Sequence, residues 1–103
     1  MAERFLAVAK VGDVPEGEGR LVEVEDRLIA LFLDGGEYFA LDDACPHQGA
    51  PLSDGMVDKK SVTCTWHGWR FGLADGRHLD GSSCRVATYP VRVVGDTIEI
   101  GIP

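Results

Sequence analysis

Short runs of β-branched and apolar residues dominate both ends of the chain. Five strands are predicted, at residues 21–25, 27–33, 37–41, 89–94 and 97–100. Glu25–Asp26, Asp34–Gly36 and Gly95–Asp96 separate neighbouring runs and suit tight hairpin turns. No window of twelve or more residues carries a helical stripe of apolar positions. The pattern therefore predicts an all-β protein with antiparallel sheets.

The middle section, residues 42–83, reads differently because it is rich in Gly, Pro, Asp and Ser. We predict that it forms loops, and loops of this length are usually functional. Strands at both ends with loops between them are typical of a small antiparallel sandwich or barrel. The predicted architecture is a rigid β framework that presents a site built from loops.

Length and charge narrow the classes of function. The 103 residues are expected to form one domain, 1–103, with a net charge of −7 and no basic run. Nucleic acids and anionic membrane surfaces select positive patches, so neither is an expected partner. The negative charge fits a basic protein partner or, alternatively, serves only solubility. No apolar run is long enough to cross a bilayer and no secretory signal is evident, which predicts a cytoplasmic protein.

The candidate chemistry lies in two Cys/His pairs within the middle section. They read C-x-H from Cys45 and, after sixteen residues, C-x-x-H from Cys64. Three cysteines in such a chain argue against a disulfide framework and favour a metal site. Zinc accepts two Cys and two His. Each pair is mixed, however, which suits a two-iron cluster with thiolates on one iron and imidazoles on the other. Residue types leave both metals open.

The wider pattern resembles the Rieske family of [2Fe–2S] proteins. The residues that carry the resemblance are Cys45-Pro46-His47-Gln48-Gly49, Cys64-Thr65-Trp66-His67-Gly68, "PLSDG" from Pro51, and "YPV" from Tyr89. The resemblance implies a small all-β domain with one [2Fe–2S] cluster at its tip, on loops at about 42–53 and 62–72. It also implies that Cys45 and Cys64 hold one iron and that His47 and His67 hold the other, more exposed one.

The positions around the ligands separate branches of this family. Respiratory members carry an extra cysteine in each ligand loop, whereas Ala50 and Trp66 stand there in this chain, so that disulfide is not expected. Respiratory members also have a Ser and a Tyr that donate hydrogen bonds to the cluster. Here Trp69 and Phe71 occupy those positions, and a lower reduction potential is expected.

The resemblance therefore implies a free-standing, monomeric ferredoxin that is an electron-transfer component of an oxidoreductase system and not itself an enzyme. It would pass electrons from a flavoprotein reductase to the terminal oxygenase of a dioxygenase system. The first alternative is the small subunit of an NADH-dependent nitrite reductase, with the large subunit as partner. An alternative of another class is a zinc-stabilised structural or adaptor module.

Other residues near the pairs are assigned supporting roles. We expect six of them to surround the cluster or to contact a partner: Gln48, Gly49, Pro51, Trp66, Gly68 and Trp69. His78 is expected to be solvated and Cys84 to be buried. Six aspartates, at positions 42, 43, 54, 58, 75 and 80, are expected to serve turns. Any of them that face one way would attract a basic partner.

Overall fold

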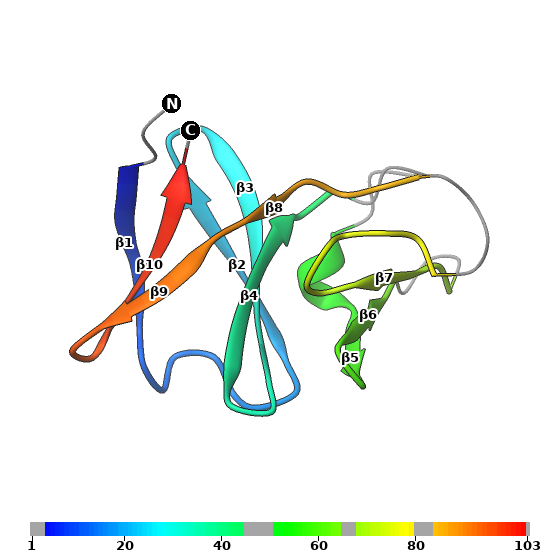
Figure 1. Ribbon diagram of the computed structural model, residues 1–103, viewed down its shortest axis with the longest axis horizontal. Coiled ribbons are helices and arrows are strands. Elements are labelled where there is room, and N and C mark those ends of the chain that lie inside the picture. Colours follow the sequence, from blue (N-terminus) through cyan, green and yellow to red (C-terminus); the bar gives the residue numbers. More distant parts are fainter. Residues whose placement is uncertain (1–3, 45–50, 65–67, 80–83, 103) are drawn as a thin grey trace.

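The computed structural model describes residues 4–44, 51–64, 68–79 and 84–102, and within them it is built from short antiparallel strands. The elements are β1 (Arg4–Lys10), β2 (Gly19–Val24), β3 (Arg27–Asp34), β4 (Glu37–Asp42), the 3-10 turn η1 (Leu52–Asp54), β5 (Met56–Asp58), β6 (Ser61–Thr63), β7 (Arg70–Gly72), β8 (Thr88–Tyr89), β9 (Val91–Val94) and β10 (Thr97–Ile102). They form three sheets, ordered β1-β10-β9, β2-β3-β4-β8 and β5-β6-β7 (Figure 1). The all-β prediction is confirmed.

The predicted hairpin turns are present in the described structure. Val24 pairs with Arg27 and Asp34 pairs with Glu37, which leaves two residues in each turn. All four turn residues have positive φ, as two-residue hairpins with the twist of the flanking strands require. A third such turn, Lys59–Lys60, joins β5 to β6 and was not predicted, because neither lysine is a typical turn residue.

The central sheet β2-β3-β4-β8 is buried on both faces. Along β3, Ile29 and Leu31 enter one apolar cluster with Ile98 and Ile100 of the β1-β10-β9 sheet. The alternate residues Ala30 and Phe32 enter a second cluster, shared with the β5-β6-β7 sheet. Burial on both faces explains why the run at 28–33 is continuously apolar and does not alternate.

Two sequence expectations about secondary structure were wrong. The first strand, β1, was not predicted, although it pairs with β10 along its length. The middle section was expected to be loops, but it holds η1 and the small sheet β5-β6-β7. Strands of three residues are too short to show an alternating pattern. Among the described residues, no helix is long and apolar enough to cross a membrane.

Candidate metal centre

The first ligand loop is closed at its base by paired backbone. Ala44 and Pro51 form an antiparallel bridge, and the Leu52 N–H donates to the Asp43 carbonyl oxygen at 2.6 Å. The Asp43 side chain is buried and accepts the Ser53 N–H at 2.8 Å. The chain before residue 45 and after residue 50 is thus held side by side. The predicted ligands Cys45 and His47, with Gln48 and Gly49, lie outside the described residues.

The second ligand loop is closed at its base by backbone hydrogen bonds between Cys64 and residues 68–69. The Cys64 N–H donates to the Trp69 carbonyl oxygen at 2.7 Å, and the Gly68 N–H donates to the Cys64 carbonyl oxygen at 3.0 Å. Gly68 has a φ of 71°, which explains why glycine follows the second His in the motif. Cys64 is 1% exposed. Trp66 and His67 lie outside the described residues.

A third loop follows β7 and is held by a short antiparallel ladder. The Val86 N–H donates to the Gly76 carbonyl oxygen at 2.8 Å, and the His78 N–H donates to the Cys84 carbonyl oxygen at 3.1 Å. Cys84 is exposed, so the expectation that it is buried was wrong. Here the backbone supplies the pairing, which leaves the Cys84 side chain on the surface.

His78 was expected to be solvated, and this was also wrong. Its ring stacks on Trp69, with centroids 4.1 Å apart and planes 11° apart, and it lies 5.5 Å from the Phe71 ring. Both of its ring nitrogens are buried. The stack joins the base of the second loop to that of the third, a contact that a polar turn sequence does not reveal.

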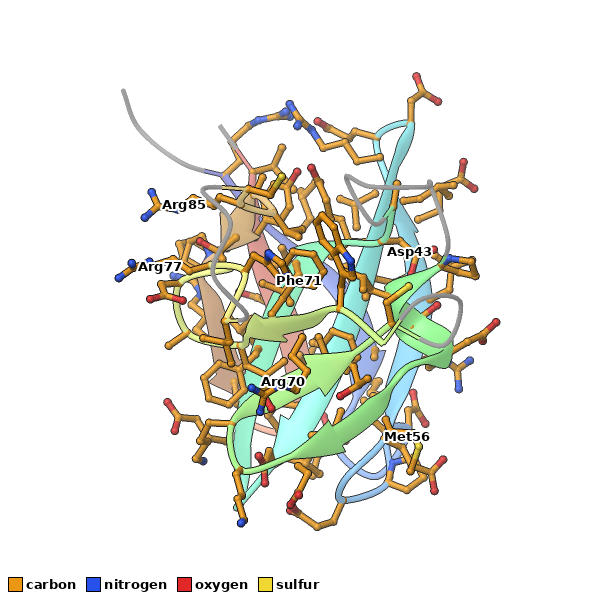
Figure 2. All side chains as sticks on the ribbon, turned by 90° about the vertical axis from the view of Figure 1, so that its right-hand side faces the viewer. Asp43, Met56, Arg70, Phe71, Arg77 and Arg85 are labelled. Carbon is orange, nitrogen blue, oxygen red and sulfur yellow. The ribbon has the colours of Figure 1, made fainter. Side chains whose placement is uncertain are left out.

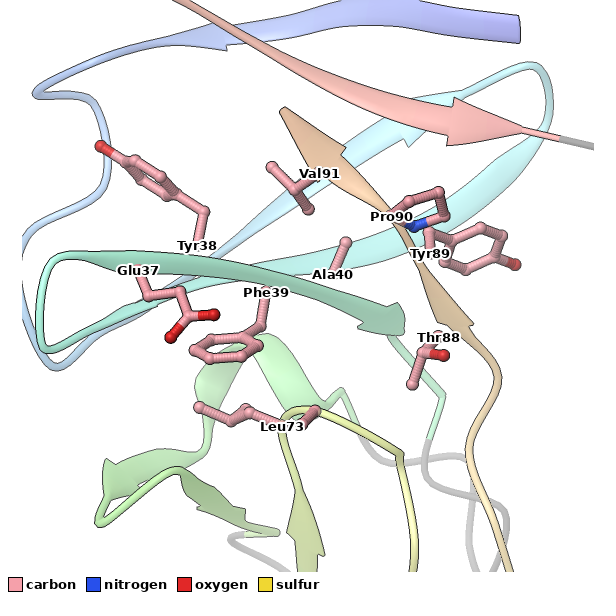
Figure 3. Close-up of a pocket in the computed structure, with 10 residues that line it drawn as sticks. Glu37, Tyr38, Phe39, Ala40, Leu73, Thr88, Tyr89, Pro90 and Val91 are labelled. Carbon is pink, nitrogen blue, oxygen red and sulfur yellow. The ribbon is translucent and has the colours of Figure 1, made fainter. Parts of the chain in front are cut away.

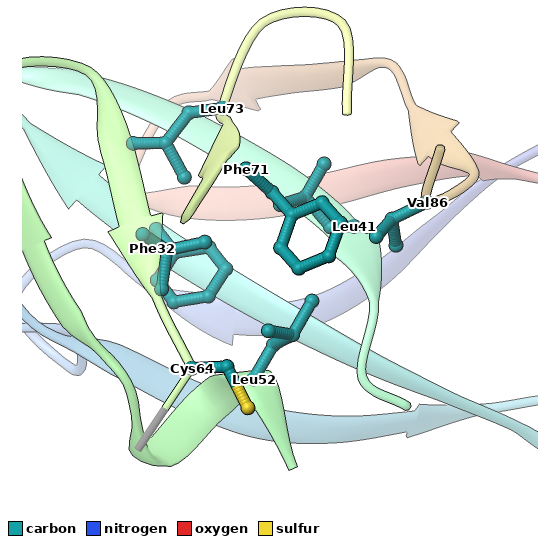
Figure 4. Close-up of a cluster of buried hydrophobic side chains, with 9 residues drawn as sticks. Phe32, Leu41, Leu52, Cys64, Phe71, Leu73 and Val86 are labelled. Atoms are coloured by element: carbon teal, nitrogen blue, oxygen red, sulfur yellow. The ribbon is translucent and has the colours of Figure 1, made fainter. Parts of the chain in front are cut away.

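The three loop bases share one apolar core. Leu52 follows the first loop, Cys64 starts the second, and Phe71 and Val86 flank the third, and all four belong to a single buried cluster with Leu41 (Figure 4). Both predicted ligand loops therefore start from the same end of the molecule, the right-hand end in Figure 1. Of the four predicted ligands, the structure describes Cys64 alone.

A groove in the described structure lies away from the loop bases. It has a volume of about 600 Å³ and runs between β4 and the segment from β8 to β9 (Figure 3). Its lining includes Phe39, Leu73 and Tyr89 and holds no cysteine or histidine. The groove is therefore not the place where Cys/His ligands would meet.

Tyr89 of β8 contacts two other strands of the central sheet, and one of them, β4, leads into the first loop. Its hydroxyl donates to the Asp42 carboxylate at 2.6 Å and accepts from the Arg27 guanidinium at 3.4 Å. Partial burial, and next the bond to Asp42, raise the pKa of the Tyr89 phenol above its ordinary value. Asp42 and Asp43 thus both serve internal contacts.

Comparison with known proteins defines the class. Residues 4–90 match the model of the Rieske [2Fe-2S] domain. A 3-phenylpropionate/cinnamic acid dioxygenase ferredoxin subunit of Shigella flexneri is 40% identical, over 90% of this chain and 89% of that protein. The ferredoxin component of a Pseudomonas aeruginosa naphthalene 1,2-dioxygenase system is 32% identical, over 99% of each chain. This chain belongs to the Rieske [2Fe-2S] domain family.

Solved structures agree with this assignment. A Sphingomonas yanoikuyae B1 ferredoxin superposes with a TM-score of 0.88 and 30% identity, over 97% of this chain and 100% of that one. A Mycobacterium tuberculosis chain described as an NADH-dependent nitrite reductase small subunit superposes with a TM-score of 0.90 and 28% identity. The match covers 100% of this chain and 98% of that one. The ferredoxin in a complex of reduced oxygenase and oxidised ferredoxin of carbazole 1,9a-dioxygenase superposes with a TM-score of 0.84 and 26% identity. The match covers 93% of this chain and 91% of that one.

The described residues fit the [2Fe–2S] cluster that the family implies. Cys64 offers a thiol at the apolar floor of a loop base, next to Leu52 and Phe71, where bulk water is excluded. A cluster bound by thiolates is stabilised by such shielding from bulk water. The described stems of both loops, Ala44 with Pro51 and Cys64 with Gly68 and Trp69, bring backbone close together at the same place.

Proposed function

We propose that this protein is a one-electron carrier that links a flavoprotein reductase to a terminal oxygenase of a dioxygenase system. The observation that carries the proposal is the shared core beneath the three loop bases, with Cys64 at its surface. The relatives named as ferredoxin components support the same role over nearly the whole chain. A [2Fe–2S] cluster supplies a reversible one-electron change, which is what such a carrier needs.

The proposed ligands are those of the sequence pattern. Cys45 and Cys64 would hold one iron, and His47 and His67 the other, in one cluster per chain. Neutral imidazoles replace two anionic thiolates in this set, so the reduced state is favoured relative to an all-cysteine cluster. In the described part of the site, Leu52, Phe71 and the Trp69–His78 stack exclude water from the side of Cys64.

The remaining expectations belong to the same proposal. The chain acts as a carrier and not as an enzyme, as a single domain over residues 1–103 and as a monomer. A cytoplasmic location suits it, because a reducing compartment protects an exposed thiol such as that of Cys84. Six residues are assigned to surrounding the cluster or contacting a partner: Gln48, Gly49, Pro51, Trp66, Gly68 and Trp69. Of these, Pro51 and Trp69 are half-buried in the described structure.

A nitrite reductase small subunit is the second candidate. The Mycobacterium tuberculosis neighbour supports it, since it superposes over the whole of this chain. The two functions differ in the electron acceptor and predict different partners. In one case the reduced protein reduces a purified oxygenase, and in the other it assembles with the nitrite reductase large subunit.

The test mixes the dithionite-reduced, desalted protein anaerobically with each acceptor in a stopped-flow instrument. We expect oxidation of the carrier by the oxygenase of a naphthalene 1,2-dioxygenase system and no stable assembly with a nitrite reductase large subunit. The opposite pattern would replace the first function by the second. A Cys64→Ala variant should lose the visible spectrum and the transfer, whereas the matched Cys84→Ala variant, altered at an exposed cysteine, should keep both.

A further inference from the structure

The third loop carries two arginines that face each other across its ladder. Arg77 and Arg85 form an antiparallel bridge. The hydrogen bonds that flank it run from the His78 N–H to the Cys84 carbonyl and from the Val86 N–H to the Gly76 carbonyl. This pattern makes Arg77 and Arg85 a non-hydrogen-bonded pair, the type in which opposite Cα atoms lie closest, about 4.5 Å apart.

Two like charges at such a position repel each other and destabilise the ladder. Both side chains are exposed, and in Figure 2 they project from the same edge of the loop-bearing end. Neither guanidinium has a hydrogen bond or an ion pair with any residue in the described ranges. The nearby Asp75 carboxylate accepts the backbone N–H of Arg77 at 3.1 Å and not its side chain.

The arrangement is unexpected in a chain with a net charge of −7. Acidic residues outnumber basic ones, yet two guanidiniums are held together beside a loop base without a carboxylate from the described residues. A pair of planar guanidiniums matches carboxylates in a fork geometry, and an external acidic group would relieve the repulsion. The net negative charge argues against nucleic acid as the source of that group.

The position of the pair indicates which partner it meets. His78 follows Arg77 and stacks on Trp69, at the base of the second ligand loop. A protein that approaches the proposed cluster end from this side would therefore lie over the two arginines. The carbazole dioxygenase neighbour was solved as a complex with its oxygenase, so an oxygenase is the partner for which a complex of this fold is known.

We propose that Arg77 and Arg85 form a docking site for an acidic patch on the terminal oxygenase, beside the cluster end. The inference rests on the proposed function and deepens it by assigning a charge sign to one part of the contact. It also modifies the sequence-based expectation of a basic partner, since the charge at this edge is opposite to that of the whole chain.

The test measures binding of the holoprotein to a purified oxygenase of a naphthalene 1,2-dioxygenase system at several salt concentrations. In the Arg77→Gln/Arg85→Gln variant we expect affinity to fall about fivefold at low salt, as for two exposed charge pairs. We expect the difference to vanish at high salt, where exposed charges are screened. The reduction potential should stay unchanged and the melting temperature should not fall, because the variant relieves the repulsion between the two arginines. These controls separate lost docking from lost structure.

The matched control is Arg20→Gln/Lys59→Gln, which removes two exposed positive charges elsewhere and changes the net charge equally. It should bind like the wild type, and Arg77→Lys/Arg85→Lys should restore part of the affinity because it keeps the charge. Equal losses in both Gln variants, or no loss in either, would overturn the docking site.

Two further outcomes separate this inference from the proposed function. If the arginine-dependent loss appears with the reductase and not with the oxygenase, the assigned partner is wrong while the carrier function stands. If the wild type fails to bind the oxygenase and assembles with a nitrite reductase large subunit, the proposed function itself fails, and the oxygenase docking site fails with it.

Discussion

The two halves of this molecule are stabilised in different ways. In the framework, strands of six to eight residues such as β3 and β10 stack two sheets around Ile29, Leu31, Ile98 and Ile100. At the cluster end, the three-residue strands β5 to β7 pack on a second apolar cluster. Individual backbone contacts, such as those of Asp43, Cys64 and Gly76, hold the loop bases in addition. Apolar burial tolerates many sequences, whereas single backbone contacts depend on particular residues. Both halves therefore gain stability from apolar burial, whereas the cluster end also depends on single backbone contacts at the loop bases.

Substitutions that create a cavity in each half should have the largest effect on stability. They should also show which half controls the reduction potential. Ile100→Ala and Leu52→Ala each remove a fully buried side chain, and each should lower the free energy of unfolding by about 3 kcal/mol. Leu52→Ala should also shift the reduction potential, since Leu52 packs in the same cluster as Cys64, while Ile100→Ala should not. Urea unfolding and protein-film voltammetry provide the two measurements. Equal potential shifts in both variants would contradict the division into halves.

Gly76→Ala should disturb the cluster end through its backbone. Gly76 has a φ of 71°, and a Cβ there would overlap the Val86 carbonyl oxygen. We expect a loss of about 2–3 kcal/mol in unfolding free energy, with lower iron occupancy. Gly95→Ala is the matched control, because Gly95 also has positive φ but open space around its Cα. It should cost about 1 kcal/mol and leave iron content unchanged. Similar iron loss in both would rule out the clash as the cause.

Asp43→Asn tests the base of the first loop. The buried carboxylate accepts the Ser53 N–H, and an amide can turn its oxygen to that donor but accepts a weaker bond. We expect a loss of about 1 kcal/mol, measured by thermal unfolding. Asp58→Asn, at an exposed position on β5, should change stability by less than about 0.5 kcal/mol. An equal effect at both positions would mean that the Asp43 contact does not stabilise the loop base.

Tyr89→Phe should have the smallest effect on stability, and this effect should appear as a change in the pH dependence of unfolding. The pKa of Tyr89 is raised in the folded protein, so the folded state favours the neutral phenol. Its contribution to stability is therefore complete below pH ~10, the ordinary value, and is lost as pH rises through the higher folded value. Chemical unfolding across pH 8–11 should show a flatter alkaline decline in the variant than in the wild type. An unchanged decline would show that another group causes it.

The difference between the halves also explains what could be predicted from the sequence. Framework strands could be predicted because they either alternate apolar and polar residues, as β10 does, or are continuously apolar, as β3 is. The family could be predicted from the spacing of the Cys and His residues. The sequence of β1 gives a weak strand signal, because residues 5–9 are continuously apolar and include two alanines, which are weak strand formers. The strands β5 to β7 have three residues each, too few to show an alternating pattern. The positions of His78, Cys84 and the Arg77–Arg85 pair depend on how the third loop folds back, which local composition does not encode.

The proposed cluster is tested most simply by the electron paramagnetic resonance spectrum of the purified protein before and after dithionite, with iron and zinc counted on the same sample. We expect about two irons per chain, no signal when oxidised, and on reduction the rhombic signal of a cluster with mixed Cys and His ligation. A colourless protein with about one zinc per chain, which also fails anaerobic reconstitution with iron and sulfide, would contradict this expectation.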